Sequence, residues 1–346
     1  MEVQPFELGS ETIPPGSRRT VNLPVSVLSD HTPASLSVHV VHGRKPGPTM
    51  FVSAAVHGDE VIGVEIVRRL LRTPHLEKLR GTLLAVPIVN AFGFMHHSRY
   101  LPDRRDLNRS FPGSARGSLA ARLANLFVQE VVLRSNVGID LHSAAIHRTN
   151  LPQIRISPGN PRTLELAAAF GAPLILTSST REGSLRQTAA EHNVDVLLYE
   201  AGEGLRFDEI AARAGVSGIM RVMHKLEMIS GKSVARMKAP PIRSSSSYWQ
   251  RAPAGGLLRT FKSTGEEVAR GTLLGIVSDP FGEAETEVTA DYAGLIIGRT
   301  NLPIVNEGDG LFHIAKVKSA GHAEATIGSL STQLEADPLF DEDEII

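Results

Sequence analysis

Residues 49–72 read TMFVSAAVHGDEVIGVEIVRRLLR and place a short apolar run directly before a helical pattern. The first part, residues 49–56, has the composition of a strand that is buried on both faces. In the second part, residues 61–72, apolar residues recur at the spacing of one helix face. These residues are Ile62, Ile66, Val67 and Leu70. A buried strand that leads into a covering helix is the unit of parallel sheets, so this stretch predicts an α/β fold.

The same alternation of short apolar runs and helical patterns continues from about residue 36 to residue 229. Further buried strands are expected at residues 82–89, 137–141 and 195–199. Helices are expected at residues 118–133, where Ser118 starts the helix, and at residues 164–170 and 218–229. The pattern favours a mixed, mostly parallel sheet flanked by helices, and we assign residues 1–235 to this domain.

The remainder of the chain has a different pattern. Residues 236–247 contain two prolines and four serines without apolar periodicity, which is typical of a linker. In residues 248–330 the strands shorten and glycines multiply, which favours a smaller all-β domain. Residues 331–346 form an acidic tail.

The β segment also repeats itself, which predicts two half-barrels. The residues Gly256, Val268, Gly271, Leu274 and Val277 recur, with a slip of one residue, as Gly294, Val305, Gly308, Leu311 and Ile314.

Composition limits the classes of function. A length of 346 residues exceeds what one compact core usually holds, in agreement with two domains. The formal net charge of −1 implies no broad basic surface, so no nucleic-acid partner is expected. Apolar runs are only strand-length and the N-terminus lacks a secretory pattern, so we expect no membrane association and a cytoplasmic location. Because the chain has no cysteine, any metal must be held by His, Asp or Glu.

Polar residues follow three of the expected strands at the point where each strand ends. His57 and Glu60 lie in HGDE after the first strand, His142 follows VGIDL, and Glu200 follows DVLLY. The carboxyl ends of strands in an open α/β sheet line one crevice, so these side chains are expected to meet. Two imidazoles and a carboxylate are a ligand set of catalytic zinc, which leaves a position for water. Glu200 is then the candidate base, which takes a proton from water and delivers it to the departing nitrogen.

Each of these residues also has a plainer interpretation. A single HxxE match arises often by chance, and a charged residue after a buried strand can be a solvated loop position. The combination at three strand ends is what favours a metal site. Asp140 lies two residues before His142 on the same strand, where it is either an orienting partner of the imidazole or a plain buried polar residue.

Residues 98–113, SRYLPDRRDLNRSFPG, predict a polar loop rich in arginine. Asn108 and Arg109 present planar groups suited to a substrate carboxylate, and Arg99 offers a second cation. Four neighbours are expected to be solvated ion pairs of the loop: Asp103, Arg104, Arg105 and Asp106. Four further histidines are expected to be structural or exposed: His96, His97, His147 and His192.

Taken together, HGDE (57–60), RDLNRSFPG (105–113), DLHS (140–143) and YEAGE (199–203) resemble the succinylglutamate desuccinylase/aspartoacylase family, which is related to zinc carboxypeptidases. The pattern is most similar to its bacterial predicted-deacylase branch. The resemblance implies one zinc ion per chain. It implies that the zinc ligands are His57, Glu60 and His142, that Glu200 is the catalytic carboxylate, and that Arg99, Asn108 and Arg109 bind substrate. It also implies a zinc carboxypeptidase-like fold with a smaller C-terminal β domain, whose repeat resembles a hammerhead barrel.

The expected function is therefore hydrolysis of an amide bond in a small N-acyl amino acid or a related compound. A zinc carboxypeptidase or peptidoglycan-peptide amidase is one alternative, because the same ligand set serves peptide bonds. A catalytically silent metal-binding or scaffold protein is the other. Members of the family often assemble, so a homo-oligomer is also an expectation.

Overall fold

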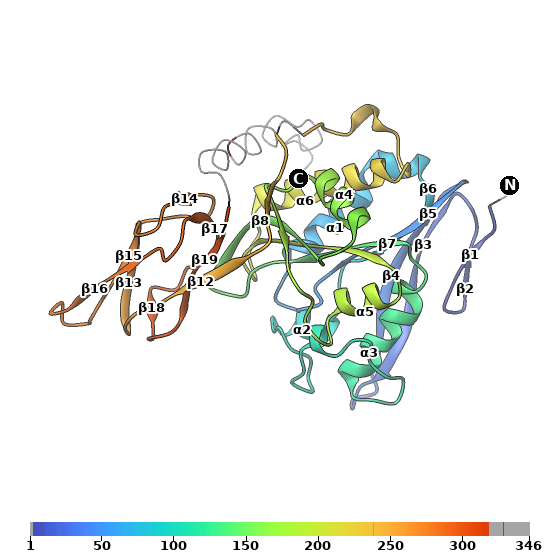
Figure 1. The fold of residues 1–346 in the computed structure, drawn as a ribbon. Helices are drawn as coiled ribbons and strands as arrows, with labels where there is room; N and C mark the ends of the chain where they lie inside the picture. The colour runs from blue at the N-terminus through green and yellow to red at the C-terminus, as the bar shows by residue number, and fades with distance from the viewer. Residues whose placement is uncertain (1–2, 238, 318–327, 329–346) are drawn as a thin grey trace.

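The computed structural model describes residues 3–237, 239–317 and 328, and a large mixed sheet organises them (Figure 1). Its strands, in spatial order, are β12 (Ser247–Arg251), β19 (Gly310–Ala315), β17 (Gly294–Thr300), β8 (Arg148–Ile156), β10 (Asp195–Gly202), β7 (Val137–His142), β5 (Lys45–Ala54), β6 (Arg80–Val86), β4 (Pro33–His42) and β3 (Ser17–Val27). Three more strands attach beside this path: β9 (Leu174–Thr177), β11 (Ile242–Ser244) and β14 (Glu267–Val268). Strands β10, β7, β5 and β6 at its centre are parallel. The predicted α/β architecture is therefore confirmed.

Helices cover both faces of the sheet (Figure 1). One face carries α1 (Ile62–Arg72), α4 (Pro161–Phe170) and α6 (Glu209–Lys225). The other face carries α2 (Ala91–Met95), α3 (Leu119–Phe127) and α5 (Leu185–Glu191). Because both faces are covered, the central strands consist of nearly continuous apolar runs instead of alternating ones.

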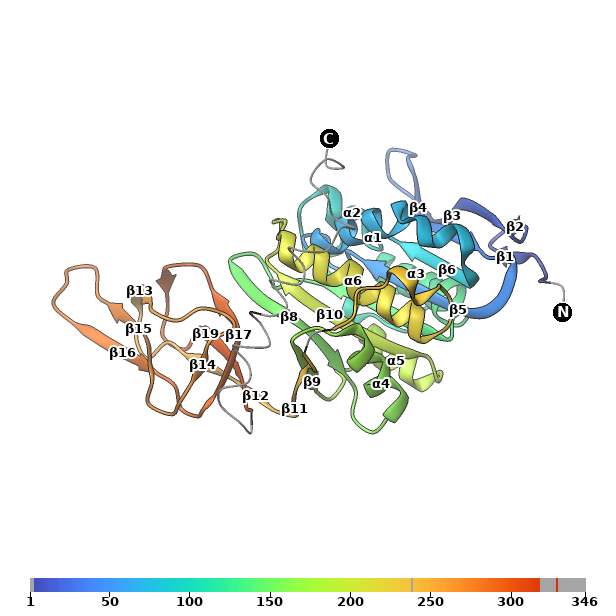
Figure 2. The same ribbon diagram turned by 90° about the horizontal axis from the view of Figure 1, so that it is seen from above.

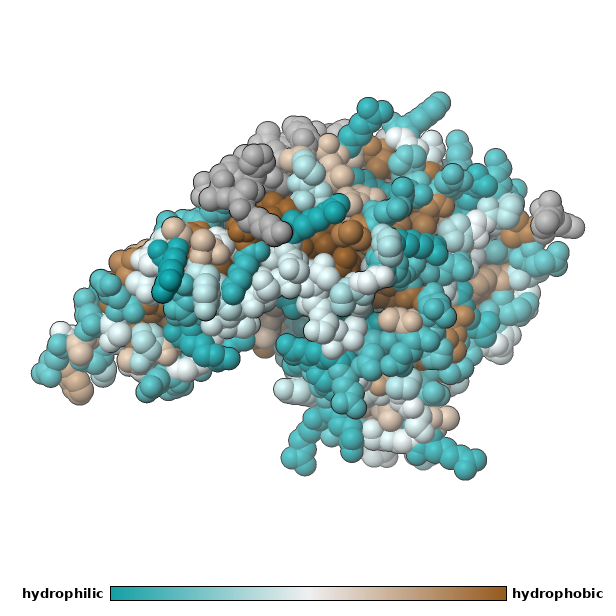
Figure 3. Space-filling model, viewed as in Figure 1, coloured by the Kyte–Doolittle hydropathy of each residue, from teal (hydrophilic) through white to brown (hydrophobic). Residues whose placement is uncertain are grey.

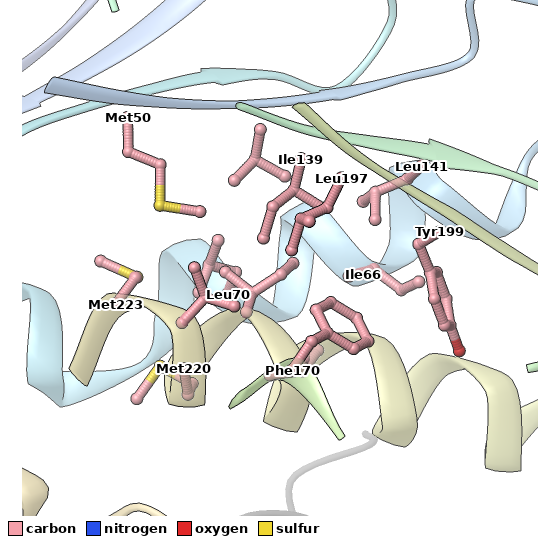
Figure 4. Packing of buried hydrophobic residues seen from close by; sticks show 14 of the residues in the cluster. Met50, Ile66, Leu70, Ile139, Leu141, Phe170, Leu197, Tyr199, Met220 and Met223 are labelled. Carbon is pink, nitrogen blue, oxygen red and sulfur yellow. The ribbon is translucent and has the colours of Figure 1, made fainter. Parts of the chain in front are cut away.

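The larger core lies between the sheet and α1, α4 and α6 (Figure 4). Met50, Ile139, Leu141, Leu197 and Tyr199 from the strands pack against Ile66, Leu70, Phe170, Met220 and Met223 from the helices. The Tyr199 hydroxyl donates to the carbonyl oxygen of Ala211, so its polar atom is satisfied inside this core. Burying one large apolar side chain contributes about 1.5–3 kcal/mol, so this layer anchors the central strands.

Local signals explain which helix ends were predicted correctly. Helix α1 agrees with the expected 61–72, and Ser118 caps α3 by accepting from the Ala121 amide. A π-helical turn, Val128–Val132, follows α3. The expected helix at 218–229 is wrong in its bounds, because Asp208 caps α6 through the Ala211 amide and the helix begins at Glu209.

The C-terminal repeat is visible as two matching sets of strands. The first set is β13 (Gly256–Thr260), β14 and β15 (Leu273–Ser278), and the second is β17, β18 (Ile304–Val305) and β19. The short strand of each set pairs with the other set, since β14 pairs with β17 and β18 pairs with β13. Repeat positions such as Val268, Leu274, Val305 and Leu311 share one core. The two predicted halves therefore interlock.

The C-terminal β region, residues 247–315, extends away from the N-terminus in both ribbon views (Figures 1 and 2). In the space-filling view it projects as a lobe with a notch below it (Figure 3).

Strand β11 lies within the expected linker and pairs with β9. The domain boundaries at 235 and 247 stay a prediction. Residues 331–346, the expected acidic tail, lie outside the described residues. Strands β1 (Phe6–Leu8) and β2 (Glu11–Ile13) form a separate two-stranded sheet, and β16 (Glu285–Thr289) belongs to a four-stranded sheet with β15, β13 and β18.

Among the helices of the described residues, none has the combination of length and apolar content required to cross a membrane.

Candidate functional site

A cavity of about 850 Å³ opens at the carboxyl ends of the central strands. It is lined by all seven residues that the sequence analysis singled out: His57, Glu60, Arg99, Asn108, Arg109, His142 and Glu200. Residues of the C-terminal β region, Ser247, Trp249 and His313, complete one wall. The arrangement agrees with the rule that ligand sites of open α/β sheets lie beyond the carboxyl ends of strands.

The HGDE turn is fixed by backbone features on both sides. Ala55, fully buried after β5, has a φ of 50°, which a non-glycine residue adopts only when its surroundings enforce it. A Cβ atom on Gly58 would lie 2.0 Å from the carbonyl carbon of Gly93 in α2, so only glycine fits there. This close approach packs the HGDE turn against the segment that leads to Arg99.

His57, Glu60 and His142 meet in a buried cluster. The Nδ1 atom of His57 lies 2.6 Å from Glu60 Oε1, and the Nδ1 atom of His142 lies 2.7 Å from Glu60 Oε2. The three side chains offer ligand atoms that all lie within 4.8 Å of one another. Two residues of one turn, His57 and Glu60, and a third that lies 82 residues after Glu60 therefore bring one possible ligand atom each into a single group.

The second nitrogen of each imidazole has its own carboxylate partner. His142 Nε2 lies 2.7 Å from Asp140 Oδ2, and the Ser53 hydroxyl donates to the other oxygen of Asp140. His57 Nε2 lies 3.1 Å from Asp106 Oδ1. Such carboxylate partners orient imidazoles that bind metals and raise their basicity.

Asp106 corrects one expectation of the sequence analysis. It is not a solvated loop residue, because it contacts His57 and also accepts from Arg99 Nη2 at 2.9 Å. Its position two residues before Asn108 in RDLNR could have indicated that it lies at the site. By contrast, Asp103 and Arg105 form the expected local pair at 3.8 Å. The histidines at 96, 97, 147 and 192 are exposed, as expected.

The imidazoles and carboxylates of the cluster stabilise one another's charged forms. Burial works against a charged His57, yet the carboxylates of Glu60 and Asp106 outweigh it and raise the pKa of His57. Burial likewise opposes a charged Glu60, but the two imidazoles hold the pKa of its carboxyl well below the ordinary value. Glu60 is therefore an anion at neutral pH, as a metal ligand must be.

The donor set fits a zinc ion. Two imidazole nitrogens and one carboxylate form a His₂Glu set, and both imidazoles keep a hydrogen-bonding partner at the other nitrogen. The surroundings are buried and polar, and no thiolate competes for the metal, since the chain has no cysteine. These residues could hold the metal that the family resemblance implies.

Arg99, Asn108 and Arg109 lie on the wall beside the cluster. Arg99 Nη1 donates to Glu60 Oε1 at 3.3 Å, so this guanidinium is already engaged with the cluster. Asn108 is buried, and its Oδ1 atom accepts from the Leu185 amide at 2.9 Å, which fixes the side chain. Arg109 is exposed at the cavity wall and donates to the Asn108 carbonyl oxygen.

Glu200 lies beside the cluster through the sheet register. It is the strand partner of His142 across β10 and β7, and both residues line the cavity. Its Oε2 atom accepts from Asn150 Nδ2 at 2.9 Å, and its Oε1 atom lies 3.5 Å from Arg155 Nη1. The carboxylate is thus held at the cavity wall by two side chains of β8.

The other cationic and aromatic residues of the cavity were not predicted from the sequence. Its lining also includes Arg148, Arg155, Arg181 and Arg186. Trp249 stacks on His313 with a centroid distance of 4.8 Å, and Arg148 lies over the Trp249 ring. These residues follow no strand end or motif, so only the fold reveals that they face one cavity.

The chain is similar to known proteins in sequence and in fold. N-α-acetyl-L-2,4-diaminobutyric acid deacetylase of Halomonas elongata is 28% identical over 287 residues, which cover 79% of this chain and 84% of that protein. A succinylglutamate desuccinylase/aspartoacylase of Rhodobacter sphaeroides has a similar structure, with a TM-score of 0.78 and 24% identity over 87% of this chain and 96% of that one. The product-bound structure of the ectoine utilization protein EutE (DoeB) of Ruegeria pomeroyi is also similar, with a TM-score of 0.77 and 23% identity over 86% of this chain and 95% of that one.

The family assignment comes from the catalytic part of the chain. The profile of the succinylglutamate desuccinylase/aspartoacylase catalytic domain matches residues 46–226, more than half of the 346 residues. This range contains all seven site residues predicted from the sequence. The chain belongs to the succinylglutamate desuccinylase/aspartoacylase family.

Proposed function

We propose that this protein is a zinc-dependent deacylase that hydrolyses the amide bond of a small N-acyl amino acid. The observation that carries the proposal is the meeting of His57, Glu60 and His142 in one cavity that Glu200 also lines. A metal ligand set without a nearby base would support binding alone. The carboxylate on the adjacent strand supports hydrolysis.

In the proposed reaction, water attacks the carbonyl carbon of the acyl group, and the C–N bond then breaks to give a carboxylate and an amine. A zinc ion held by His57, Glu60 and His142 supplies Lewis acidity, which acidifies water and polarises a carbonyl group. Glu200 accepts a proton from the attacking water and later delivers it to the departing nitrogen. Asp106 and Asp140 hold the two imidazoles in place for this work.

The charges of the cavity support a substrate with a carboxylate. Six arginine side chains line it, against two acidic ones, Glu60 and Glu200, among the described residues. Arg109 and Asn108 are the groups we assign to the α-carboxylate of the amino acid, with Arg99 as a further cation. The Halomonas relative is named for an N-acetylated amino acid, which agrees with this class of substrate.

The shape of the cavity favours a small substrate over a peptide. Its volume of about 850 Å³ lies within the range of small-molecule sites, which is about 300–1,000 Å³. Trp249 and His313 from the C-terminal β region form one wall of the cavity, whereas a carboxypeptidase or peptide amidase would need an open groove. A silent metal-binding protein would have no use for a base at Glu200.

Metal analysis combined with a hydrolysis screen tests the proposal. The purified protein is expected to contain one zinc ion per chain and to release the amine from N-acetyl, N-succinyl or N-formyl amino acids. Preference within the panel then identifies the acyl group and the amine half. A zinc-loaded protein that hydrolyses none of these compounds but cleaves peptides would contradict the proposal in favour of the peptidase alternative.

A further inference from the structure

The carboxylate of Glu200, on β10, is held by two side chains of a neighbouring strand. Asn150 Nδ2 donates to Oε2 at 2.9 Å, and Arg155 Nη1 lies 3.5 Å from Oε1, so each carboxylate oxygen has one partner. Both partners belong to β8, which pairs antiparallel with β10. Neither partner lies near Glu200 in sequence, since the separation for Asn150 is 50 residues.

An irregularity in the strand pairing places Asn150 beside Glu200. Glu200 is the partner of Gln153, whereas Gly202 is the partner of Asn150, so β8 uses three steps where β10 uses two. This extra residue is a β-bulge, a feature that re-aims side chains and is frequent next to active sites. Without the bulge, a regular register would place Leu151 opposite Gly202.

The C-terminal β region makes room for the Asn150 side chain. Register partners form a continuous row from Gly202 through Asn150, Gly298 and His313 to Trp249, across β10, β8, β17, β19 and β12. A Cβ atom on Gly298 would lie 2.7 Å from Asn150 Oδ1. Any side chain at position 298 would therefore displace the amide that donates to Glu200.

We propose that Asn150, seated against Gly298, is a positioning residue that fixes the carboxylate of Glu200, so that the C-terminal β region acts on catalysis through this contact. The proposal rests on the proposed function, in which Glu200 moves protons. Arg155 assists from the other oxygen of the carboxylate. The C-terminal region thus contributes more than a wall of the cavity, because its packing determines where the base lies.

The first test replaces Asn150. We expect Asn150→Ala to lower kcat by about tenfold to a hundredfold with little change in KM, because a misplaced base slows turnover without removing the substrate-binding groups. Asn150→Asp keeps the shape but replaces the donor with a like charge, and we expect it to be no more active than Asn150→Ala. A merely structural asparagine would tolerate this near-isosteric change. Zinc content is measured in each variant and is expected to stay unchanged.

The second test displaces the Asn150 side chain by a change in the C-terminal β region, at Gly298. Gly298→Ala is expected to lower kcat by about fivefold or more, because its new methyl group displaces the amide. Gly255→Ala is the matched control in the same region, since no atom lies closer than 3.7 Å to its new Cβ, and we expect kcat within about twofold of wild type. In the Asn150→Ala background, Gly298→Ala should have no further effect. Additive losses would overturn the route through Asn150.

Crystal structures of wild type and Gly298→Ala separate this inference from the proposed function. A Glu200 carboxylate that turns away in Gly298→Ala, while the wild type hydrolyses no N-acyl amino acid, upholds the positioning and refutes the function. An active wild type, with Gly298→Ala as active as Gly255→Ala and Glu200 unmoved, refutes the positioning and leaves the function intact.

Discussion

The cavity has two halves that differ in how completely their charges are paired. The metal half contains His57, Glu60 and His142, which line the cavity, together with their partners Asp106 and Asp140, and every imidazole nitrogen there has a carboxylate partner. The arginine half contains Arg155, Arg181, Arg186, Glu200 and His313. Within the described part of the chain, Arg155 Nε and Arg186 Nη1 are buried there without a hydrogen-bonding partner.

This difference indicates two tasks. The metal half is organised in advance, because its partners fix each donor before any ligand arrives. The arginine half carries excess positive charge, and burial together with the neighbouring Arg155 lowers the pKa of Arg186 to about 10. Arg186 remains a cation at neutral pH. Unpaired donors in a buried site are costly, and an anionic part of the substrate would offset that cost.

The largest expected effect is the loss of zinc and activity when a histidine of the metal half, but not one of the arginine half, is replaced. His142→Ala should abolish zinc binding and activity together, because it removes one of three ligands and the imidazole that Glu60 and Asp140 both contact. Zinc content by atomic spectroscopy and kcat/KM measure this. His313→Ala is the control of the same residue type in the arginine half, and its zinc content should equal that of wild type. Loss of zinc in the His313 variant would break the division.

The next effect concerns the base. Glu200→Gln should reduce kcat by about 10²–10⁴-fold while zinc content stays at the wild-type level, because the amide cannot accept a proton from water. Glu203→Gln is the control within the same YEAGE motif, since Glu203 accepts from the His147 amide and from Asn301 and does not line the cavity. Full activity of the Glu200 variant would contradict the assignment.

Much of the metal half could be predicted from the sequence, and the reason is geometric. Parallel strands deliver their carboxyl ends to one edge, so residues at the ends of the expected strands must come together once the strands are recognised. This applies to His57 and His142 of the metal half and also to Glu200 of the arginine half. Strand recognition was reliable at 137–141 and 195–199 because continuous apolar runs between polar segments leave few alternatives.

The other residues of the arginine half could not be predicted in this way. Arg155 lies near the end of β8 and Arg186 at the start of α5, and Trp249 and His313 come from antiparallel strands whose partners are distant in sequence. Antiparallel register depends on turns and bulges, and a shift of one residue reverses the side chains. The start of α6 was predicted wrongly for a local reason, because the helix begins at the Asp208 cap and this cap has no apolar pattern of its own.

A smaller effect sharpens the description of the metal half. Asp140→Asn should weaken zinc binding by about tenfold to a hundredfold, because the amide no longer supports the imidazole as a carboxylate does. The affinity is measured by competition with a chelating dye. Asp103→Asn is the control, because Asp103 lies in the neighbouring loop and accepts from the Ala120 amide, away from either imidazole. Equal affinities of both variants would show that Asp140 is only a buried polar residue.

The smallest effect concerns the arginine half and substrate charge. Arg186→Gln should lower kcat/KM for an N-acetylated dicarboxylic amino acid by about tenfold, which corresponds to one charge-assisted hydrogen bond of about 1.4 kcal/mol. For an N-acetylated diamino acid, whose side chain is cationic, the same variant should leave kcat/KM unchanged or raise it, because a repulsive charge is removed. Arg251→Gln, on β12 outside the cavity, is the control and should change neither value. If Arg186→Gln lowered both values equally, the guanidinium would act on the fold of the loop around Ser178, to which it donates, and the arginine half would not select substrates by charge.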